Sequence, residues 1–454
     1  MAKKGRDGGS LPILKASAAG IDIGSAEHWV AVPIDCADEH VRSFSALTHG
    51  LHEVADWLQA CGIQTVAMEA TGVYWVPLYE ILEERGIEVC LVNAHHVHNV
   101  PGRKSDVLDC QWLQQLHSYG LLRASFRPSA DFVALRTYLR HRESLLRSNA
   151  RFIQQMQKSM TLMNIKLDRV VTDVAGDTSM RIIRDIVAGQ RDPVLLARHR
   201  DPRCKASEAE LADSLRGEYR ADLLFTLRHG LELYDAHQQR LVECDVEIQN
   251  LVDAIAVNMP AVEPPRTATK VRRDRRRDPK LNVHASLHRI AGGVDLYQVA
   301  GIAEITAVQL IAEIGTDMTA WPTAKHFASW TTLAPGCRIT GGKRYRPKRP
   351  HSAHRVAQIL RMAAVSAGRT QSAIGAFYRR LSARIGKAKA IVATAAKLAR
   401  IIYALLKNGT RFEETGADAY EQHYRDRVLR NLKRKAHALG FDLVEKPALA
   451  ESVS

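Results

Sequence analysis

Short apolar runs and stretches of helical spacing alternate along the first quarter of the chain. The short runs predict strands at residues 16–24, 28–34, 41–47, 63–68 and 87–92. Apolar residues at helical spacing predict one helix after the third strand, one after the fourth and one after the fifth. The last of these helices opens at Ser105, a residue type that commonly caps helix N-termini. An α/β layer is therefore expected at the N-terminus.

Helical spacing dominates the rest of the chain. Residues 131–167 and 207–256 predict two long helices, the second with a break near Gly217. The apolar residues of the second follow heptads, which predicts a coiled coil formed within one chain or between two chains. Prolines and charges at 191–203 predict a linker or small subdomain between these helices. Residues 353–406 predict two closely packed alanine-rich helices, and residues 420–440 predict an amphipathic basic helix.

Four carboxylates occupy informative positions in this pattern. Asp22 interrupts the first apolar run, where an uncompensated charge is costly, and Glu69 ends the fourth strand. Asp106 and Asp109 follow Ser105 and lie three residues apart, so a helix places both on one face. Acids in these places match a ribonuclease-H-like layer and could bind two Mg²⁺ ions, or Mn²⁺, for phosphoryl transfer. Each acid alone also has a structural explanation, such as the helix dipole.

Basic residues give the chain a formal net charge of +15. This charge indicates a polyanionic partner, nucleic acid rather than a membrane surface. Residues 262–280 combine prolines and cations without an apolar period, which predicts an arm that contacts phosphates without reading bases. Charge runs are often merely solvated, but the overall basicity favours contact. The residues predicted to contact nucleic acid are Arg103, Lys104, Arg272, Arg273, Arg275, Arg276, Arg277, Lys343, Arg344, Arg346 and Lys348.

Cysteines and histidines offer little support for a metal other than magnesium. The seven cysteines are spread along the chain without a CxxC pair, which is typical of reduced thiols in the cytoplasm. His95, His96 and His98 keep zinc as an alternative, although such a loop more often contacts phosphate or solvent. No apolar run approaches the ~18 residues that a membrane span needs, so no membrane partner is expected.

Two features of the C-terminal part suggest contact with phosphate. Thr340 precedes Gly341 and Gly342 in a strongly basic loop, where cations lower the cost of an alkoxide developing on an attacking hydroxyl. Residues 299–315 resemble one half of a helix-hairpin-helix, whose turn presents backbone N–H groups to a DNA phosphate. Ala303 replaces the second glycine of that turn, which weakens this interpretation.

Several long motifs in order carry a family resemblance. They are GIDIG with Asp22, MEATGVYW with Glu69, NVPGRKSDVLDCQWLQQLHSYGLL with Asp106 and Asp109, and then VAGIAEITA, LAPGCRITGGKR and AIGAFYRRL. The chain resembles the DEDD-type transposases of the insertion sequence 110 family, in the branch related to insertion sequence 1111. The resemblance implies a RuvC-like N-terminal domain, a coiled-coil insertion, a C-terminal transposase domain and Mg²⁺-dependent DNA recombination.

The resemblance also implies a mechanism and partners. A hydroxyl residue of the C-terminal domain attacks DNA and forms a covalent bond, and the acids of another protomer complete the site, which requires a homodimer or homotetramer. A structured guide RNA encoded by the element selects donor and target DNA, in a prokaryotic cytoplasm at the nucleoid. The family's nucleophile is typically serine, whereas this chain has Thr340. Either this branch uses threonine, or nearby Ser352 serves, or this copy is impaired.

The sequence thus predicts α/β plus all-α architecture and an enzyme that moves its own insertion sequence. The predicted parts are a flexible N-terminus (1–14), a RuvC-like DEDD domain (15–128), a helical coiled-coil region (129–261), a basic linker (262–284), a C-terminal transposase domain (285–415) and a basic helix with its tail (416–454). A RuvC-like junction endonuclease that uses water as nucleophile is one alternative. A non-catalytic nucleic-acid-binding protein is another.

Overall fold

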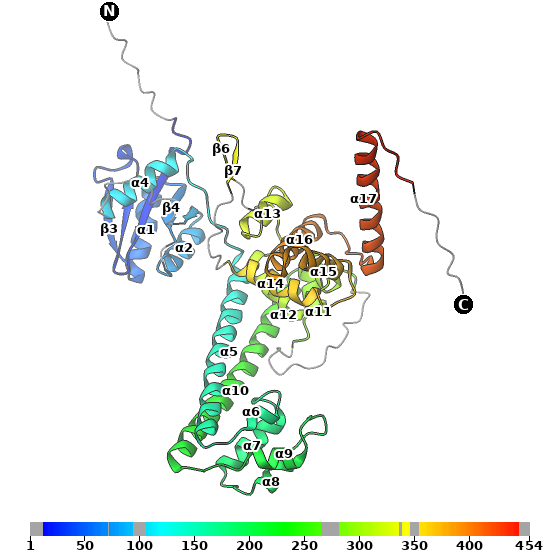
Figure 1. The fold of residues 1–454 in the computed structure, drawn as a ribbon. Coiled ribbons are helices and arrows are strands. Elements are labelled where there is room, and N and C mark those ends of the chain that lie inside the picture. Colours follow the sequence, from blue (N-terminus) through cyan, green and yellow to red (C-terminus); the bar gives the residue numbers. More distant parts are fainter. Residues whose placement is uncertain are drawn as a thin grey trace, which may run out of the picture. The chain divides into compact units, whose positions relative to one another are not determined.

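The chain forms two compact units, Met1–Arg127 and Pro128–Ser454. The computed structural model describes residues 12–70, 72–93, 106–264, 281–335, 338–345 and 354–444. The first unit is an α/β layer and the second is helical apart from one short hairpin (Figure 1). The architecture is therefore mixed α/β at the N-terminus with a mainly helical remainder, as the sequence predicts.

A five-stranded mixed sheet forms the centre of the first unit. Its strands are β1 (Ala18–Ile23), β2 (Glu27–Ala31), β3 (Val41–Ser45), β4 (Thr65–Glu69) and β5 (Glu88–Val92), in the spatial order β3-β2-β1-β4-β5. The first three strands form an antiparallel meander, and β4 and β5 run parallel to β1. The predicted order of strands and helices is confirmed, with strands somewhat shorter than expected and a 3-10 turn, η1 (Ile34–Cys36), after β2.

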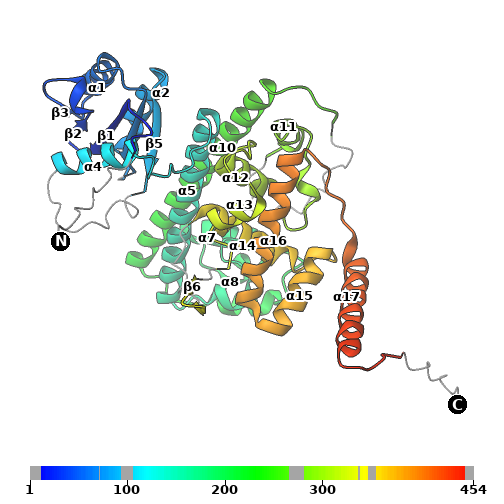
Figure 2. The same cartoon turned by 90° about the horizontal axis from the view of Figure 1, so that it is seen from above.

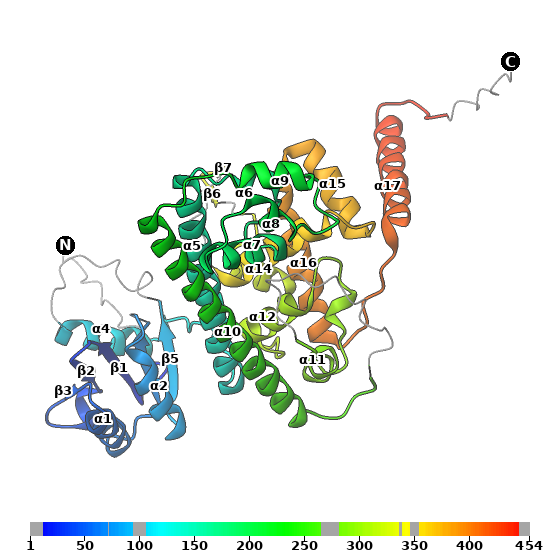
Figure 3. The same ribbon diagram turned by 90° about the horizontal axis from the view of Figure 1, so that it is seen from below.

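Helices cover both faces of this sheet. On one face, α1 (Thr48–Ala60) and α2 (Trp75–Glu84) pack on the alternate apolar residues of β1, β2 and β4. On the other face lies α4 (Asp106–Ser118), which packs on small residues of β1 and β4 through Cys110 and Leu113 (Figure 3). Both faces of the central strands are buried, so a polar side chain there is conspicuous.

Two long helices pair within the second unit. Helix α5 (Ala130–Leu162) runs antiparallel to α10 (Ala221–Val257), and the two lie side by side in Figures 1 and 2. The buried guanidinium of Arg142 donates to the carboxylate of Asp245, and the hydroxyls of Ser159 and Thr226 are 2.8 Å apart. Pairing within one chain is therefore observed for the predicted long helices.

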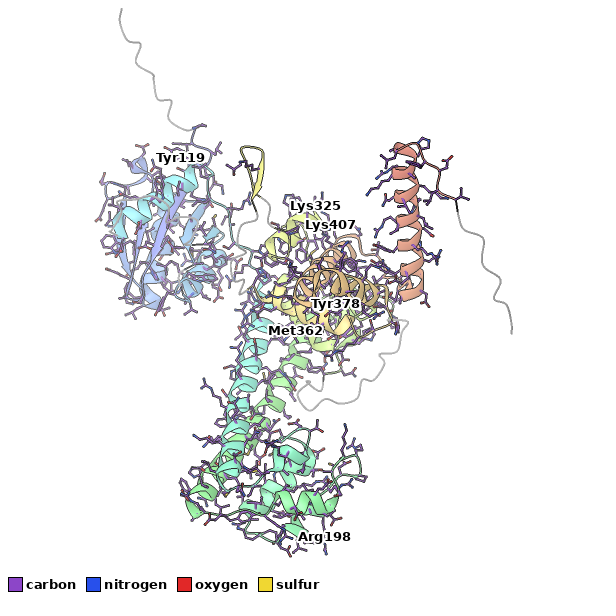
Figure 4. The ribbon with its side chains drawn as sticks, viewed as in Figure 1. Tyr119, Arg198, Lys325, Met362, Tyr378 and Lys407 are labelled. Carbon is purple, nitrogen blue, oxygen red and sulfur yellow. The ribbon has the colours of Figure 1, made fainter. Side chains whose placement is uncertain are left out.

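A small helical subdomain connects the far ends of α5 and α10. It contains α6 (Leu167–Val170), α7 (Asp177–Val187), α8 (Pro193–Ala197) and α9 (Glu208–Ser214), and Arg198, labelled in Figure 4, follows α8. Its apolar residues, which include Ile182, Ile183 and Leu196, form one core with the adjoining ends of α5 and α10. The prediction of a small subdomain in this region is confirmed, and we call it the tip subdomain (residues 163–220).

The described C-terminal part consists of several helices and one short hairpin. The elements are α11 (His284–Ile290), η2 (Leu296–Gln298), α12 (Glu304–Ile314), α13 (Ala324–Trp330), β6 (Arg338–Thr340), β7 (Lys343–Tyr345), α14 (Arg355–Ala367), α15 (Ala373–Ile385), α16 (Lys387–Asn408) and α17 (Gly416–Ala438). In the described part of the chain, no helix is both long and apolar enough to cross a membrane.

Both alanine-rich helices predicted in residues 353–406 form, as α14 and α16, but a third helix that was not predicted, α15, lies between them. Helix α14 ends before Gly368, where an added Cβ would lie 2.4 Å from the ring of Tyr378 (labelled in Figure 4). Ser372 then caps α15 by accepting a hydrogen bond from the backbone N–H of Gly375 at 3.0 Å. Small and polar residues thus end one helix and begin the next within a few positions.

Candidate active site

Strand alternation brings Asp22 and Glu69 to the same face of the sheet. Ile21 and Ile23 belong to the core under α1, so Asp22 between them faces the opposite side, toward α4. On the neighbouring strand Ile21 pairs with Met68, which belongs to the same core, so Glu69 also faces the α4 side. The two predicted acids therefore lie on adjacent strands, near the carboxyl ends of both.

Helix α4 brings the other two acids to this face. Asp106 and Asp109 occupy its first turn, and its later turns are fixed to the sheet. Gln114 Nε2 donates to the backbone oxygen of Ala18 at 3.2 Å, and the buried His117 ring lies 2.8 Å from the hydroxyl of Thr65. Rigid attachment of the helix to β1 and β4 positions its first turn beside the sheet.

Close approach of α4 depends on Gly20. A Cβ at this position would lie 2.3 Å from both the backbone oxygen of Cys110 and the backbone nitrogen of Gln114. Real Cβ atoms do not approach backbone atoms this closely, so only glycine lets α4 pack directly on β1. Gly20 was not among the predicted site residues, although a glycine within an apolar strand signals close backbone approach.

The pKa of Asp22 shows that the other three carboxylates lie close to it. Burial raises the pKa of Asp22, and the charges of Asp106, Asp109 and Glu69 raise it further, to about 6. Each of these three acids must lie near Asp22 to have this effect. The face of the sheet under the start of α4 is consequently a concentrated negative site, in which ionisation of Asp22 is costly.

The donor set suits a hard divalent cation. In the described part of the chain, no three or more His, Cys, Asp or Glu side chains come together as a cage that could hold a metal ion. Mg²⁺ does not need such a cage, because it typically binds one or two carboxylates and completes its octahedron with water and substrate phosphate oxygens. Carboxylates that repel one another across an open face fit that mode of binding, so Asp22, Glu69, Asp106 and Asp109 could hold Mg²⁺.

Thr340 lies at the tip of a hairpin in the second unit. Strand β6 ends at Thr340, β7 begins at Lys343, and the two residues are paired. Gly341 and Gly342 have φ values of 55° and 73°, which a two-residue turn with two positive φ angles requires and glycine adopts without strain. The expected basic loop is thus an ordered hairpin here, with Thr340 and Lys343 exposed at its end.

Many predicted contact residues lie outside the described residues. These are Arg103, Lys104, Arg272, Arg273, Arg275, Arg276, Arg277, Arg346, Lys348, the alternative nucleophile Ser352 and the possible zinc ligands His95, His96 and His98. Lys343 is exposed, and the backbone of Arg344 belongs to β7. The six described cysteines are free thiols, which agrees with the expectation of reduced cysteines.

The turn at Gly301 serves packing. Gly301 is buried with a φ of 91°, and an added Cβ would lie 2.3 Å from the backbone oxygen of Ala363 on α14. Ile302, the next residue, is also buried. A turn enclosed by α14 cannot present this glycine to a DNA phosphate, so the interpretation of residues 299–315 as a helix-hairpin-helix half is wrong at this position.

Gly20→Ala is expected to reduce DNA strand cleavage about 100-fold. The new methyl group must move the α4 backbone by about 1 Å, and a displacement of that size at a catalytic group costs about this much. Overpacking should also lower the free energy of unfolding by about 1–3 kcal/mol. Cleavage rates and melting temperatures of the purified variant measure both effects.

Gly62→Ala is the matched control for this substitution. Gly62 has a φ of 68° and nothing within 4 Å of an added Cβ, so its replacement strains the backbone without displacing α4. If Gly20→Ala were no less active than Gly62→Ala at equal stability, the positioning role of Gly20 would be refuted.

Comparison with protein families agrees with this geometry. Residues 19–165, which contain all four acids, match the profile of the IS110 DEDD transposases, described as Transposase. Residues 295–379, which contain Thr340, match the profile described as Transposase IS116/IS110/IS902 family. Among curated proteins, none matches the chain. With matches in both of its units, the chain belongs to the IS110 family of transposases.

Proposed function

We propose that the protein is a Mg²⁺-dependent DNA recombinase that excises and inserts its own insertion sequence. The observation that carries this proposal is the gathering of four carboxylates on one face of the sheet, where three of them raise the pKa of Asp22. The sheet order β3-β2-β1-β4-β5 supports a RuvC-like domain. The antiparallel pair α5 and α10 supports the coiled-coil insertion that the family resemblance implies.

The four acids hold the metal in this proposal. Asp22 and Glu69 are carried by the central strands, and Asp106 and Asp109 by the first turn of α4, so all four are fixed to rigid elements. When bound, Mg²⁺ or Mn²⁺ activates an attacking oxygen and stabilises a leaving one in phosphoryl transfer. The pKa of Asp22, raised to about 6, means that this carboxyl holds its proton to a higher pH than an ordinary aspartate, and a bound cation would favour its ionised form.

Thr340 is the proposed nucleophile. Its Oγ1 forms a bond to a DNA phosphorus, and the bond from that phosphorus to one deoxyribose oxygen breaks. The hydroxyl proton passes to solvent, and the released deoxyribose oxygen takes up a proton. Lys343, paired with Thr340 across the turn, adds positive charge near the developing alkoxide. The phosphate remains a diester, now esterified to Thr340. The hydroxyl of a second DNA end can therefore attack this phosphate, release Thr340 and join the two DNA ends.

The proposed assembly and partners rest on the family resemblance, and the division of the chain into two units is compatible with them. The acids lie in Met1–Arg127 and Thr340 lies in Pro128–Ser454. We propose that the acids of one protomer serve Thr340 of another, so the active form is a homodimer or homotetramer. Donor and target DNA are the substrates, a structured RNA from the element selects them, and the protein works at the nucleoid.

A covalent-adduct assay tests this function. Purified protein is mixed with Mg²⁺, a DNA that spans the junction of the element's ends and RNA transcribed from the element's flank, then denatured and run on a gel. We expect a protein–DNA adduct and recombined product, both lost when the metal is chelated. Omission of the RNA should remove site selection and with it the recombined product.

The same assay separates the alternatives. The four acids lie within one unit of the chain and would suffice for hydrolysis by water, which favours a junction endonuclease as the second candidate. That enzyme would cleave DNA in Mg²⁺ without any adduct. A protein that binds DNA and yields neither cleavage nor adduct under any metal condition would contradict both enzymatic proposals.

A further inference from the structure

Helix α17 carries a continuous basic face. After Asp426 the chain has no acidic residue until Asp442, and between them lie Arg427, Arg430, Lys433, Arg434 and Lys435. His423, Arg427, Arg430, Arg434 and His437 follow one another at spacings of four and three residues, which places them on one face of the helix. Lys433 borders this face. We call these six residues the α17 basic face, and all of them are exposed.

Carboxylates do not neutralise this face. Within the described residues, none of its four Arg and Lys side chains has an ion-pair partner; Arg427 lies over the ring of Tyr424 and Arg434 reaches Asn431. Some surface arginines elsewhere in the chain are paired with acids, as Arg203 is with Asp201, at 2.9 Å. The positive charge of α17 is therefore available to an external anion.

Helix α17 is anchored to α15 through a different set of side chains. The guanidinium of Arg380 lies over the rings of Tyr420 and Tyr424 and pairs with Glu421. Lys397 lies 4.5 Å from the ring centre of Phe377 and 5.1 Å from that of Tyr420. Residues in the first turns of α17 (Figure 1) thus attach the helix to the rest of the unit, and the cations of the basic face take no part in this attachment.

The side chains of the α17 basic face indicate which kind of ligand it binds. Its aromatic neighbours Tyr420 and Tyr424 are occupied by Arg380, so the face offers no ring for stacking unpaired bases. None of its six residues is Asn or Gln, and the neighbouring amide of Asn431 already contacts Arg434, so the face presents mainly cations. A membrane surface would need a broad apolar face, whereas the exposed large apolar residues within α17 are Val428 and Leu432. A face that presents mainly cations is suited to the phosphate backbone of a double helix.

We propose that the α17 basic face binds the phosphate backbone of duplex DNA without reading its sequence. From His423 to His437 the face extends about 21 Å along the helix, enough to contact several phosphates of one strand. Helix α17 lies outside the residues matched by either family profile. The proposal goes beyond the proposed recombinase function and holds whichever residue attacks DNA, because binding is measured without cleavage.

Salt dependence of binding tests this proposal. The full-length variant Arg427→Gln, Arg430→Gln, Lys433→Gln and Arg434→Gln is compared with wild type for a 30-base-pair DNA of arbitrary sequence, by fluorescence anisotropy from 50 to 300 mM KCl without Mg²⁺. Each lost phosphate contact lowers the slope of log K against log salt by about 0.9, so the slope should fall by about 3–4. The affinity at 100 mM KCl should fall at least about tenfold.

A control variant removes the same number of positive charges from another part of the chain. Arg203, Arg216, Arg220 and Arg240 are exposed and each pairs with a nearby acid, so their replacement by Gln should change the slope by less than about one unit. Gln is also a good helix former, and α17 has no buried residue, so the helical content by circular dichroism should be unchanged in the α17 variant. Equal losses of slope in both variants would overturn the proposal, since bulk charge would then explain them.

Binding to duplex RNA of the same sequence tests whether the α17 basic face contacts the phosphates of DNA or those of RNA. We expect the α17 variant to lose at least as much affinity for DNA as for RNA. An unchanged slope with DNA together with a reduced slope with RNA would overturn the proposal in favour of an RNA-binding face.

Discussion

Asp22→Asn is expected to abolish DNA strand cleavage and, in the same protein, to raise the melting temperature measured without metal at neutral pH. Loss of one metal-binding carboxylate removes several kcal/mol of transition-state stabilisation, which corresponds to roughly 10³-fold or more in rate. The stability effect has the opposite sign because burial disfavours the ionised Asp22 carboxylate, which its three acidic neighbours also repel.

The pH dependence follows from the raised pKa of Asp22. The folded protein holds this proton up to about pH 6, whereas the ordinary value is 3.8. The stability that the protonated group contributes is therefore fully present below about pH 4 and is lost as pH rises through 6. At pH 7.5 without metal, Asp22→Asn should unfold at a temperature a few degrees above wild type, with a gain of about 1–3 kcal/mol in the free energy of unfolding. Near pH 4 the two proteins should be equal.

Magnesium should reverse this order. Added Mg²⁺ should raise the melting temperature of wild type, because a cation that binds only the folded state stabilises it, and should have a smaller effect on Asp22→Asn. Asp38, exposed in the same unit, provides the control, since Asp38→Asn should change neither cleavage nor the response to Mg²⁺. An Asp22→Asn protein that retained cleavage would exclude Asp22 from the metal site.

Thr340→Ala is expected to eliminate the covalent protein–DNA adduct and all recombination. The hydroxyl is the attacking group, and alanine has none, so the loss should reach the background of the assay. Thr340→Ser should retain the adduct and form it at least as fast, because serine keeps the hydroxyl and loses the methyl branch that restricts χ1. The hairpin should survive both changes, since its turn depends on Gly341 and Gly342.

Ser352→Ala is the companion variant, because Ser352 is the other candidate nucleophile. We expect it to form the adduct as wild type does. An adduct that persisted in Thr340→Ala and vanished in Ser352→Ala would transfer the role to Ser352, while cleavage without an adduct in every variant would favour water as nucleophile.

The arrangement of the first unit could be predicted because its physical causes are local. Strand and helix periods differ along the sequence, and Asp22 stands out because a charge inside an apolar run needs a reason. The face that each acid occupies also follows from alternation along a strand once the partner strands are known. The predicted acids therefore meet in the fold through rules that a single sequence carries.

Features that depend on contacts between distant segments could not be predicted. The heptads of α10 fit a partner in the same chain or in another, and only the antiparallel register with α5 shows which one is used. The role of Gly20 depends on the backbone of α4, which is about 90 residues away in sequence. Helix α15 was missed because alanine-rich sequence on both sides masks a boundary set by Gly368 and Ser372.

The shared core of the tip subdomain has a consequence for how this architecture can vary. Helices α5 and α10 make their own polar contacts along their length, and the tip subdomain packs its apolar residues against the adjoining ends of the same two helices. The entropy lost in closing the connection between two paired helices rises only with the logarithm of its length, by about 0.6 kcal/mol per doubling. Evolution can therefore shorten, enlarge or exchange the segment between the paired helices at little entropic cost, provided that the new segment also covers Met156, Met160, Leu227 and Leu231.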